Sequence, residues 1–137
     1  LWRNASTGEL TLWRMNGTAI SETASLGTVS GNYKAIKAVG DFNGDGKADL
    51  LWQDSSTGGL DVWLMNGTAT SSMGSPGTVS DANWRVQGAG DFDGDGKADI
   101  LWRHAETGEV YLWFMNGLSY SSYSPVGTVD DLDWSIK

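Results

Sequence analysis

The chain has 137 residues, 39% of them hydrophobic and 11% aromatic, so it is long enough for one folded domain and is not a disordered tail. It has no cysteine, which excludes a disulfide framework and thiol chemistry. Its formal net charge of −8 argues against nucleic acid as a partner, and no apolar run approaches the length needed for membrane insertion.

The sequence repeats itself every 50 residues. Two sets of tryptophans recur in step, namely Trp2, Trp52 and Trp102, and then Trp13, Trp63 and Trp113. A fixed period of this length predicts a repeat architecture. We divide the chain into residues 1–50, 51–100 and 101–137, and the third unit is truncated before an aspartate loop of its own. The chain is 13 residues short of three full units and lacks an initiating methionine, so we expect a processed product or a piece of a longer chain.

An aspartate-rich loop at residues 41–49 returns at residues 91–99. Oxygen ligands at its positions 1, 3, 5 and 9, with the backbone carbonyl of position 7, suit a hard cation such as Ca²⁺. The predicted ligands are Asp41, Asn43, Asp45, Lys47 and Asp49 in the first loop and Asp91, Asp93, Asp95, Lys97 and Asp99 in the second. We expect two Ca²⁺ per chain, tighter binding at the second loop because it has one more carboxylate, and lysine side chains directed to solvent. Zinc is disfavoured, since His104 is the only soft ligand in the chain.

Short strands are predicted between the loops. In chain order, the strands and turns of the best-defined unit are 84–90, the loop 91–99, 98–103, a turn at 105–108, 109–115, a turn at 116–117, and a stretch that ends at 126–129. Both faces of 109–115 are largely apolar, so we expect this strand to be covered on both sides. No segment shows an apolar period of helical type. Four antiparallel strands in each repeat predict an all-β fold built of β-propeller blades.

Three blades are too few to close a propeller ring, which usually contains four to eight. We therefore expect the ring to be completed either by oligomerisation or by a longer parent chain. In a homo-oligomer, residues 134–137 of one chain would lie beside residues 1–3 of the next. Such head-to-tail contacts give a ring if the rotation closes and a filament if it does not.

The repeated unit resembles a known family. Residues 90–103 read Gly-Asp-Phe-Asp-Gly-Asp-Gly-Lys-Ala-Asp-Ile-Leu-Trp-Arg, and Thr-Gly-Glu at 107–109 and Trp-Phe-Met-Asn-Gly at 113–117 follow. This pattern resembles the FG-GAP/VCBS repeats of bacterial secreted proteins and is more distantly similar to integrin α-subunit propellers and certain fungal propeller lectins. The resemblance implies that each aspartate loop links two strands of a blade and binds Ca²⁺. It also implies a secreted or cell-surface location.

The sequence gives little support for catalysis. His104 has no repeated counterpart and is interpreted as a turn residue, and the carboxylates cluster as metal ligands, so we predict that the chain is not an enzyme.

Binding of carbohydrate is the sharper functional hypothesis, because aromatic faces with polar neighbours can stack against sugar rings. The tryptophans that recur in register are more simply read as blade-packing residues. The candidate ligand-binding residues are therefore Trp84, Arg85, Trp134, Tyr120 and Tyr123.

We thus read the chain as an extracellular calcium-binding repeat protein that acts in carbohydrate or adhesion recognition, with glycans as possible partners. The alternative is a self-assembling scaffold, in a ring or a filament, that binds no small molecule except calcium. A glycan array that shows no binding, together with an oligomer that forms only in calcium, would favour the scaffold.

Overall fold

A computed structural model describes residues 1–29 and 33–137, and every regular element in these ranges is a β-strand. The strands are β1 (Trp2–Arg3), β2 (Glu9–Asn16), β3 (Ala19–Thr28), β4 (Tyr33–Gly40), β5 (Asp49–Asp54), β6 (Gly59–Asn66), β7 (Ala69–Thr78), β8 (Trp84–Gly90), β9 (Asp99–His104), β10 (Glu109–Asn116) and β11 (Ser119–Thr128). No helix capable of spanning a membrane occurs in the part of the chain that the structure describes.

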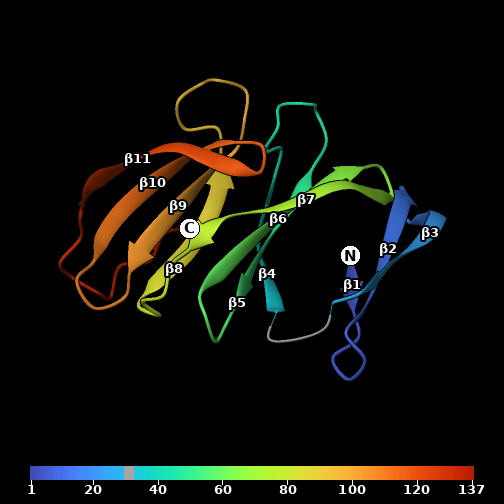
Figure 1. Ribbon diagram of the computed structural model, residues 1–137, viewed down its shortest axis with the longest axis horizontal. Coiled ribbons are helices and arrows are strands. Elements are labelled where there is room, and N and C mark those ends of the chain that lie inside the picture. The colour runs from blue at the N-terminus through green and yellow to red at the C-terminus, as the bar shows by residue number, and fades with distance from the viewer. Residues whose placement is uncertain (30–32) are drawn as a thin grey trace.

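The strands form three antiparallel sheets that stand side by side in chain order (Figure 1). Sheet 1 is β1-β2-β3, sheet 2 is β4-β5-β6-β7, and sheet 3 is β8-β9-β10-β11. This confirms the predicted all-β fold of antiparallel, blade-like sheets, and the three sheets do not close a ring (Figure 1). Each four-stranded sheet takes one strand from before an aspartate loop and three from after it, so each loop links neighbouring strands. Among the described residues, sheet 1 has no counterpart of the strand that β4 and β8 supply to the other two sheets.

The hairpins that form the outer half of each sheet follow from local sequence. The Asn-Gly pairs at 16–17, 66–67 and 116–117 turn β2 into β3, β6 into β7 and β10 into β11, with a positive φ at each glycine. Register in β10–β11 runs from Asn116↔Ser119 to Glu109↔Thr128 with two irregularities. The last strand, β11, occupies the stretch expected between the 116–117 turn and residues 126–129, and the hairpin pairs along its whole length.

Two hydrophobic cores lie between the sheets, and alternation along β5 and β6 of sheet 2 serves both of them. In β5, Leu50 and Trp52 face sheet 1, whereas Leu51 faces sheet 3. The core between sheets 1 and 2 contains Leu10, Val29, Leu50, Trp52 and Met65. The core between sheets 2 and 3 contains Ala38, Phe42, Leu51, Leu60, Val62, Ala98, Ile100, Trp102 and Met115.

Sheet 3 is covered on one face. In β10, Tyr111, Trp113 and Met115 belong to the core shared with sheet 2, while Leu112 and Phe114 alternate with them and point away from it. The expectation that this strand is covered on both sides is met by another sheet on one side only, because sheet 3 stands at the end of the row among the described residues (Figure 1), and on the other side Leu112 and Phe114 are half-buried. Its counterpart β6 in the middle sheet does contribute to both cores.

Candidate metal centre and aromatic pocket

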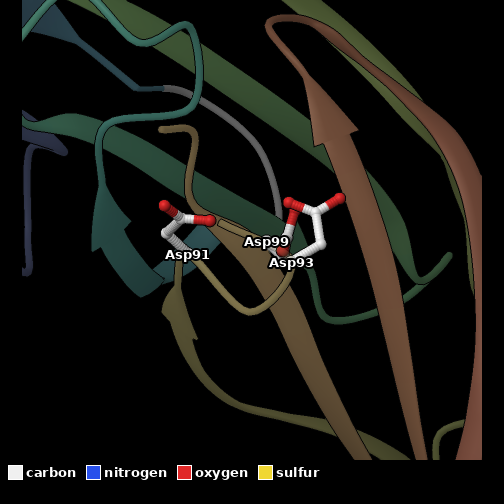
Figure 2. Close-up of side chains that lie close together, drawn as sticks. All are labelled: Asp91, Asp93 and Asp99. Carbon is white, nitrogen blue, oxygen red and sulfur yellow. The ribbon is translucent and has the colours of Figure 1, made fainter. Parts of the chain in front are cut away.

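The second aspartate loop, between β8 and β9, gathers carboxylates at one point (Figure 2). One oxygen each from Asp91, Asp93 and Asp99 lies within 4.8 Å of the others, with Asp99 buried and the other two exposed. Among the residues that the structure describes, this is the group of acidic side chains with the spacing of a metal site. The first loop does not form such a group of three carboxylates, since Asn43 stands at the position of Asp93.

The first aspartate of each loop folds the chain around itself. Asp91 accepts hydrogen bonds from the backbone N–H groups of Gly94 at 2.7 Å and Gly96 at 3.0 Å. Asp41 does the same for Gly44 at 2.7 Å and Gly46 at 2.6 Å. The glycine at position 6 has a φ of 80° in the first loop and 85° in the second, a conformation that other residues rarely adopt. The turn thus places the side-chain oxygens on its inner side.

The last aspartate of each loop is buried and ties the loop to the sheet. Asp99 accepts backbone hydrogen bonds from Phe92 at 3.0 Å and from Met115 at 2.9 Å. Asp49 has the equivalent bonds, from Phe42 at 2.9 Å and Met65 at 2.8 Å. Burial raises the pKa of Asp49 and of Asp99, and the backbone hydrogen bonds oppose this effect without cancelling it. A cation beside these groups would favour their charged form.

The lysine at position 7 folds back onto the loop. Lys97 Nζ lies 2.8 Å from Asp95 Oδ2, and Lys47 Nζ lies 3.1 Å from Asp45 Oδ2. The hydrogen bond from Lys97 is the main reason why the pKa of Asp95 is lowered, and the bond from Lys47 has the same effect on Asp45. The lysine side chains thus lie at the surface, as predicted, but each also pairs with the aspartate two residues before it, where the ammonium group offsets the negative charge of the loop.

The chemistry of the second loop fits a hard cation. Its donors are all oxygens, as Ca²⁺ prefers, and each carboxylate retains lone pairs beyond those engaged by backbone N–H groups. The group formed by Asp91, Asp93 and Asp99 could therefore bind a metal ion. The full sets of five ligands predicted for each loop remain a prediction.

Backbone contacts also join the first loop to sheet 3. Ala98 N–H donates to the carbonyl of Asp41 at 2.6 Å, and Gly117 N–H donates to the carbonyl of Phe42 at 2.8 Å. A Cβ placed on Gly40 would lie 2.6 Å from the Cβ of Ala98, so glycine is needed where β4 meets the second loop. The two loops are consequently neighbours, and a change in one loop reaches the next sheet.

A second candidate site is a cavity of about 200 Å³ on the face of sheet 3 that is turned towards sheet 2. We call it the aromatic pocket, and its lining residues are Val79, Trp84, Trp102, Tyr111, Trp113, Tyr120 and Tyr123. The rings pack in two runs. Trp84 meets Tyr111 edge-on at 5.3 Å, and Trp113 meets Tyr120 at 4.6 Å. The sequence-predicted residues Trp84, Tyr120 and Tyr123 are brought together here.

The aromatic character of this pocket does not come from the repeat. Trp102 and Trp113 recur in every unit, but four lining residues do not. At the positions of Trp84, Tyr111, Tyr120 and Tyr123, sheet 2 has Lys34, Asp61, Thr70 and Met73, although Trp84 itself returns one period later as Trp134. Tyr111 was missed as a candidate, although its replacement of Asp61 and of Thr11 in the repeat was a visible signal. Substitution of four neighbouring positions by aromatic residues distinguishes this face from its counterpart in sheet 2.

The other two ligand candidates lie elsewhere. Arg85 lines a polar cleft of about 380 Å³ beside the aromatic pocket, and the cleft shares Val79 and Trp84 with it. Trp134 lines neither space and is highly exposed. Its backbone carbonyl accepts a hydrogen bond from the Arg103 guanidinium group, which also donates to the carbonyls of Val129 and Asp131.

His104 has a structural role, as the sequence suggested. Its Nδ1 accepts backbone hydrogen bonds from Glu106 at 3.3 Å and Thr107 at 3.1 Å, so Nε2 carries the proton that is donated to Asp81 at 3.2 Å. Its ring also meets Trp84 edge-on at 5.0 Å. His104 therefore closes the 105–108 turn and holds one wall of the aromatic pocket.

Comparison with protein families matches residues 41–102 to a family described as the FG-GAP-like repeat. The matched segment contains both aspartate loops and the strands between them. No curated protein and no solved structure matched the chain. A repeat of this kind is a binding or scaffold module, and such repeats are generally not enzymes. The comparison therefore identifies an FG-GAP-like repeat at residues 41–102.

Proposed function

We propose that the chain is an extracellular calcium-binding module that recognises carbohydrate through the aromatic pocket. The observation that carries the recognition step is the replacement of four repeat positions by aromatic residues around one cavity. The proposal has a metal part and a ligand part, and each can fail without the other.

The metal part is supported by the oxygen-only donor set of the loops. The second loop would hold Ca²⁺ through Asp91, Asp93, Asp95 and Asp99 with the backbone carbonyl of Lys97. The first would use Asp41, Asn43, Asp45 and Asp49 with the carbonyl of Lys47, giving two ions per chain. Bound Ca²⁺ would offset the mutual repulsion of the carboxylates and compete with Lys97 for Asp95. Affinities of about 10⁻⁴–10⁻³ M, typical of extracellular modules, would suffice outside cells and not in the cytosol.

The ligand part is supported by the shape and chemistry of the aromatic pocket. Its volume, about 200 Å³, lies below the roughly 300–1,000 Å³ of sites for drug-sized ligands, which suits one ring rather than a long oligomer. Exposed Tyr120 and Tyr123 offer flat faces for stacking. Arg85 in the adjoining cleft would favour an acidic or hydroxyl-rich extension.

A glycan array followed by titration of the bound sugar tests the ligand part. Tyr123→Ser should abolish binding and leave the melting temperature nearly unchanged, because Tyr123 is 62% exposed. Met73→Ser is the matched control, since Met73 holds the equivalent position in sheet 2, is 61% exposed and lies outside the pocket. Binding that survives Tyr123→Ser, or an array with no bound glycan, would refute recognition by this pocket.

Chelation separates the metal part from the ligand part. With EDTA we expect weaker sugar binding, because the loop at 91–99 is tied through Asp99 to β10, the strand that carries Tyr111 and Trp113. Calcium binding without any glycan would support the metal part while excluding carbohydrate recognition. Glycan binding that is unchanged by Ca²⁺ and by EDTA would support carbohydrate recognition and would exclude a role of the metal in it.

A further inference from the structure

Sheet 1 and sheet 3 leave open the two surfaces that sheet 2 has covered. On the open face of sheet 1, Trp2 is 57% exposed and Met15 is 51% exposed. Their counterparts Trp52 and Met65 in sheet 2 are 1% and 3% exposed, because sheet 1 packs against them. The residues are the same in type and register, so the difference in exposure comes from the missing neighbour.

The open face of sheet 3 shows the same contrast from the other side. Phe92 is 49% exposed, whereas Phe42 at the same loop position is fully buried. Phe42 is buried in the core shared with sheet 3, and its carbonyl accepts the Gly117 N–H from the β10–β11 turn. No such turn reaches Phe92 within the described residues. The β2–β3 turn at 16–17 has the same sequence as the turn that covers Phe42.

The C-terminal segment is folded like the start of another sheet. Before β8, Asn83 N–H donates to the side chain of Asp81 at 2.9 Å and Trp84 N–H donates to its carbonyl at 3.1 Å. Before Trp134, the equivalent bonds go to Asp131 at 3.1 Å and 3.3 Å. Arg103 holds this turn in place through three carbonyls. The turn that precedes β8 therefore has a counterpart immediately before Trp134.

We propose that sheet 3 of one copy docks on sheet 1 of a second copy, and that residues 134–137 add the missing strand beside β1. The partner must present two tryptophans, a methionine and an Asn-Gly turn on one sheet face, and the chain presents that set at residues 2, 13 and 15–17. Within the chain, sheets 1 and 2 and then sheets 2 and 3 already pack in this manner. The contact is the third instance of one interface, which explains why both unmatched faces are apolar.

The register of the added strand follows from β8 and β9, where Trp84 pairs with His104, Arg85 with Arg103 and Val86 with Trp102. By the repeat, Trp134 of one copy pairs with Asn4 of the other, Ser135 with Arg3, and Ile136 with Trp2. Ile136 then takes the place of Val86, which packs against a core. The turn at Gly17 covers Phe92, and the Gly17 N–H donates to the Phe92 carbonyl.

Cysteine cross-linking tests this register, because the chain has no cysteine of its own. Arg3→Cys and Ser135→Cys are made in separate chains, mixed and oxidised, and intact mass identifies the mixed dimer. Directly opposed residues of an antiparallel pair lie roughly 4.5–5.5 Å apart at Cα, within disulfide reach. We expect a mixed dimer from this pair and none from Ser6→Cys mixed with Ser135→Cys. Equal cross-linking of both pairs, or no mixed dimer from the first, would overturn the proposal.

Sedimentation of the 137-residue chain supplies a second test. We expect an assembly of two or more copies, and a monomer for Phe92→Ser with its far-UV circular dichroism unchanged. Met73→Ser should assemble like the parent chain, because Met73 is 61% exposed, more than Phe92, but lies in sheet 2 away from both open faces. A monomeric parent chain would show that the open faces are covered by something other than a second copy, and would contradict the proposal.

Discussion

The backbone N–H of Met115 donates to Asp99 Oδ1 at 2.9 Å across 16 positions of sequence. Met65 and Asp49 make the equivalent bond in sheet 2 at 2.8 Å. Each aspartate loop is thus fastened to the end of an interior strand of its own sheet, β10 in one case and β6 in the other. A cation held by the loop would therefore stabilise the sheet as well as the loop.

Asp99→Ala should destabilise the protein even without calcium. The change leaves the N–H groups of Phe92 and Met115 without their acceptor, and unsatisfied buried donors cost about 1–3 kcal/mol each. We expect a loss of about 2–4 kcal/mol in the free energy of unfolding, measured by urea denaturation in EDTA. Asp93→Ala is the control, because its side chain is exposed, and it should reduce only the calcium-dependent part of the stability. Equal losses for both variants in EDTA would contradict this account.

Gly40→Ala should weaken the packing of sheet 2 on the second loop. The new Cβ would lie 2.6 Å from the Cβ of Ala98 and 3.4 Å from that of Ala89, so one backbone must move. We expect a loss of about 1–3 kcal/mol, the usual effect of overpacking. Gly88→Ala has open space around its Cβ, so it should be neutral or stabilise by up to about 1 kcal/mol. Thermal unfolding of the two variants in parallel compares them, and a harmless Gly40→Ala would argue against this close contact.

His104→Asn should impair the aromatic pocket more than the fold. Asn4 and Asp54 stand at the equivalent positions and accept the same two backbone hydrogen bonds, so the turn should persist. The bond to Asp81 and the ring contact with Trp84 are lost, at a cost of about 1–2 kcal/mol. Sugar affinity, measured by titration, should fall as Trp84 loosens. Asp54→Asn serves as the control, and equal affinities for the two variants would show that His104 does not position Trp84.

The pH dependence of stability should differ between the chelated and the calcium-loaded protein. Burial raises the pKa of Asp49 and Asp99 above the ordinary 3.8, so the folded state retains protons that the unfolded state has released. This contribution to stability is present below about pH 3.8 and is lost as pH rises through the folded-state pKa values. The pKa of Asp45 and of Asp95 is lowered in the folded state. Their contribution to stability is therefore present above about pH 3.8 and is lost as pH falls below that value.

Thermal melts from about pH 3.5 to pH 7 separate these effects. In EDTA we expect the melting temperature to fall as pH rises above about 4, and calcium should reverse this fall because it binds the deprotonated carboxylates. Asp99→Asn should make the fall in EDTA smaller. A melting temperature in EDTA that rises steadily to pH 7 would show that burial of these two carboxylates does not govern the response.

Much of the fold could be predicted because the same pattern of strands and core residues recurs in each repeat of the sequence. The strand predicted at 84–90 coincides with β8, the one predicted at 98–103 is displaced from β9 by one residue, and the one predicted at 109–115 ends one residue before β10 does. Repetition of Trp52 as Trp102, and of Met65 as Met115, marked core positions before any contact was known. That the face of β10 with the half-buried Leu112 and Phe114 points away from sheet 2 could not be predicted, since alternation within a strand does not tell whether another sheet follows.

The aromatic pocket was only partly predictable. Trp84, Tyr120 and Tyr123 could be named as candidates, but pairing of β10 with β11 is needed to place Trp113 opposite Tyr123 and so close to Tyr120. The return of Lys97 onto Asp95 depends on a side-chain rotamer that spacing does not encode. Register and rotamers, rather than residue types, set the limit here.

Calorimetric titration of the chelated chain with CaCl₂, with thermal melts in Ca²⁺ and in EDTA, tests the central claim that cations at the two loops hold the sheets together. We predict two ions per chain and a clearly higher melting temperature in Ca²⁺, since about 2.7 kcal/mol of stabilisation follows from a ligand at 100 times its Kd. Absence of binding heat together with identical melting curves in Ca²⁺ and EDTA would contradict the claim.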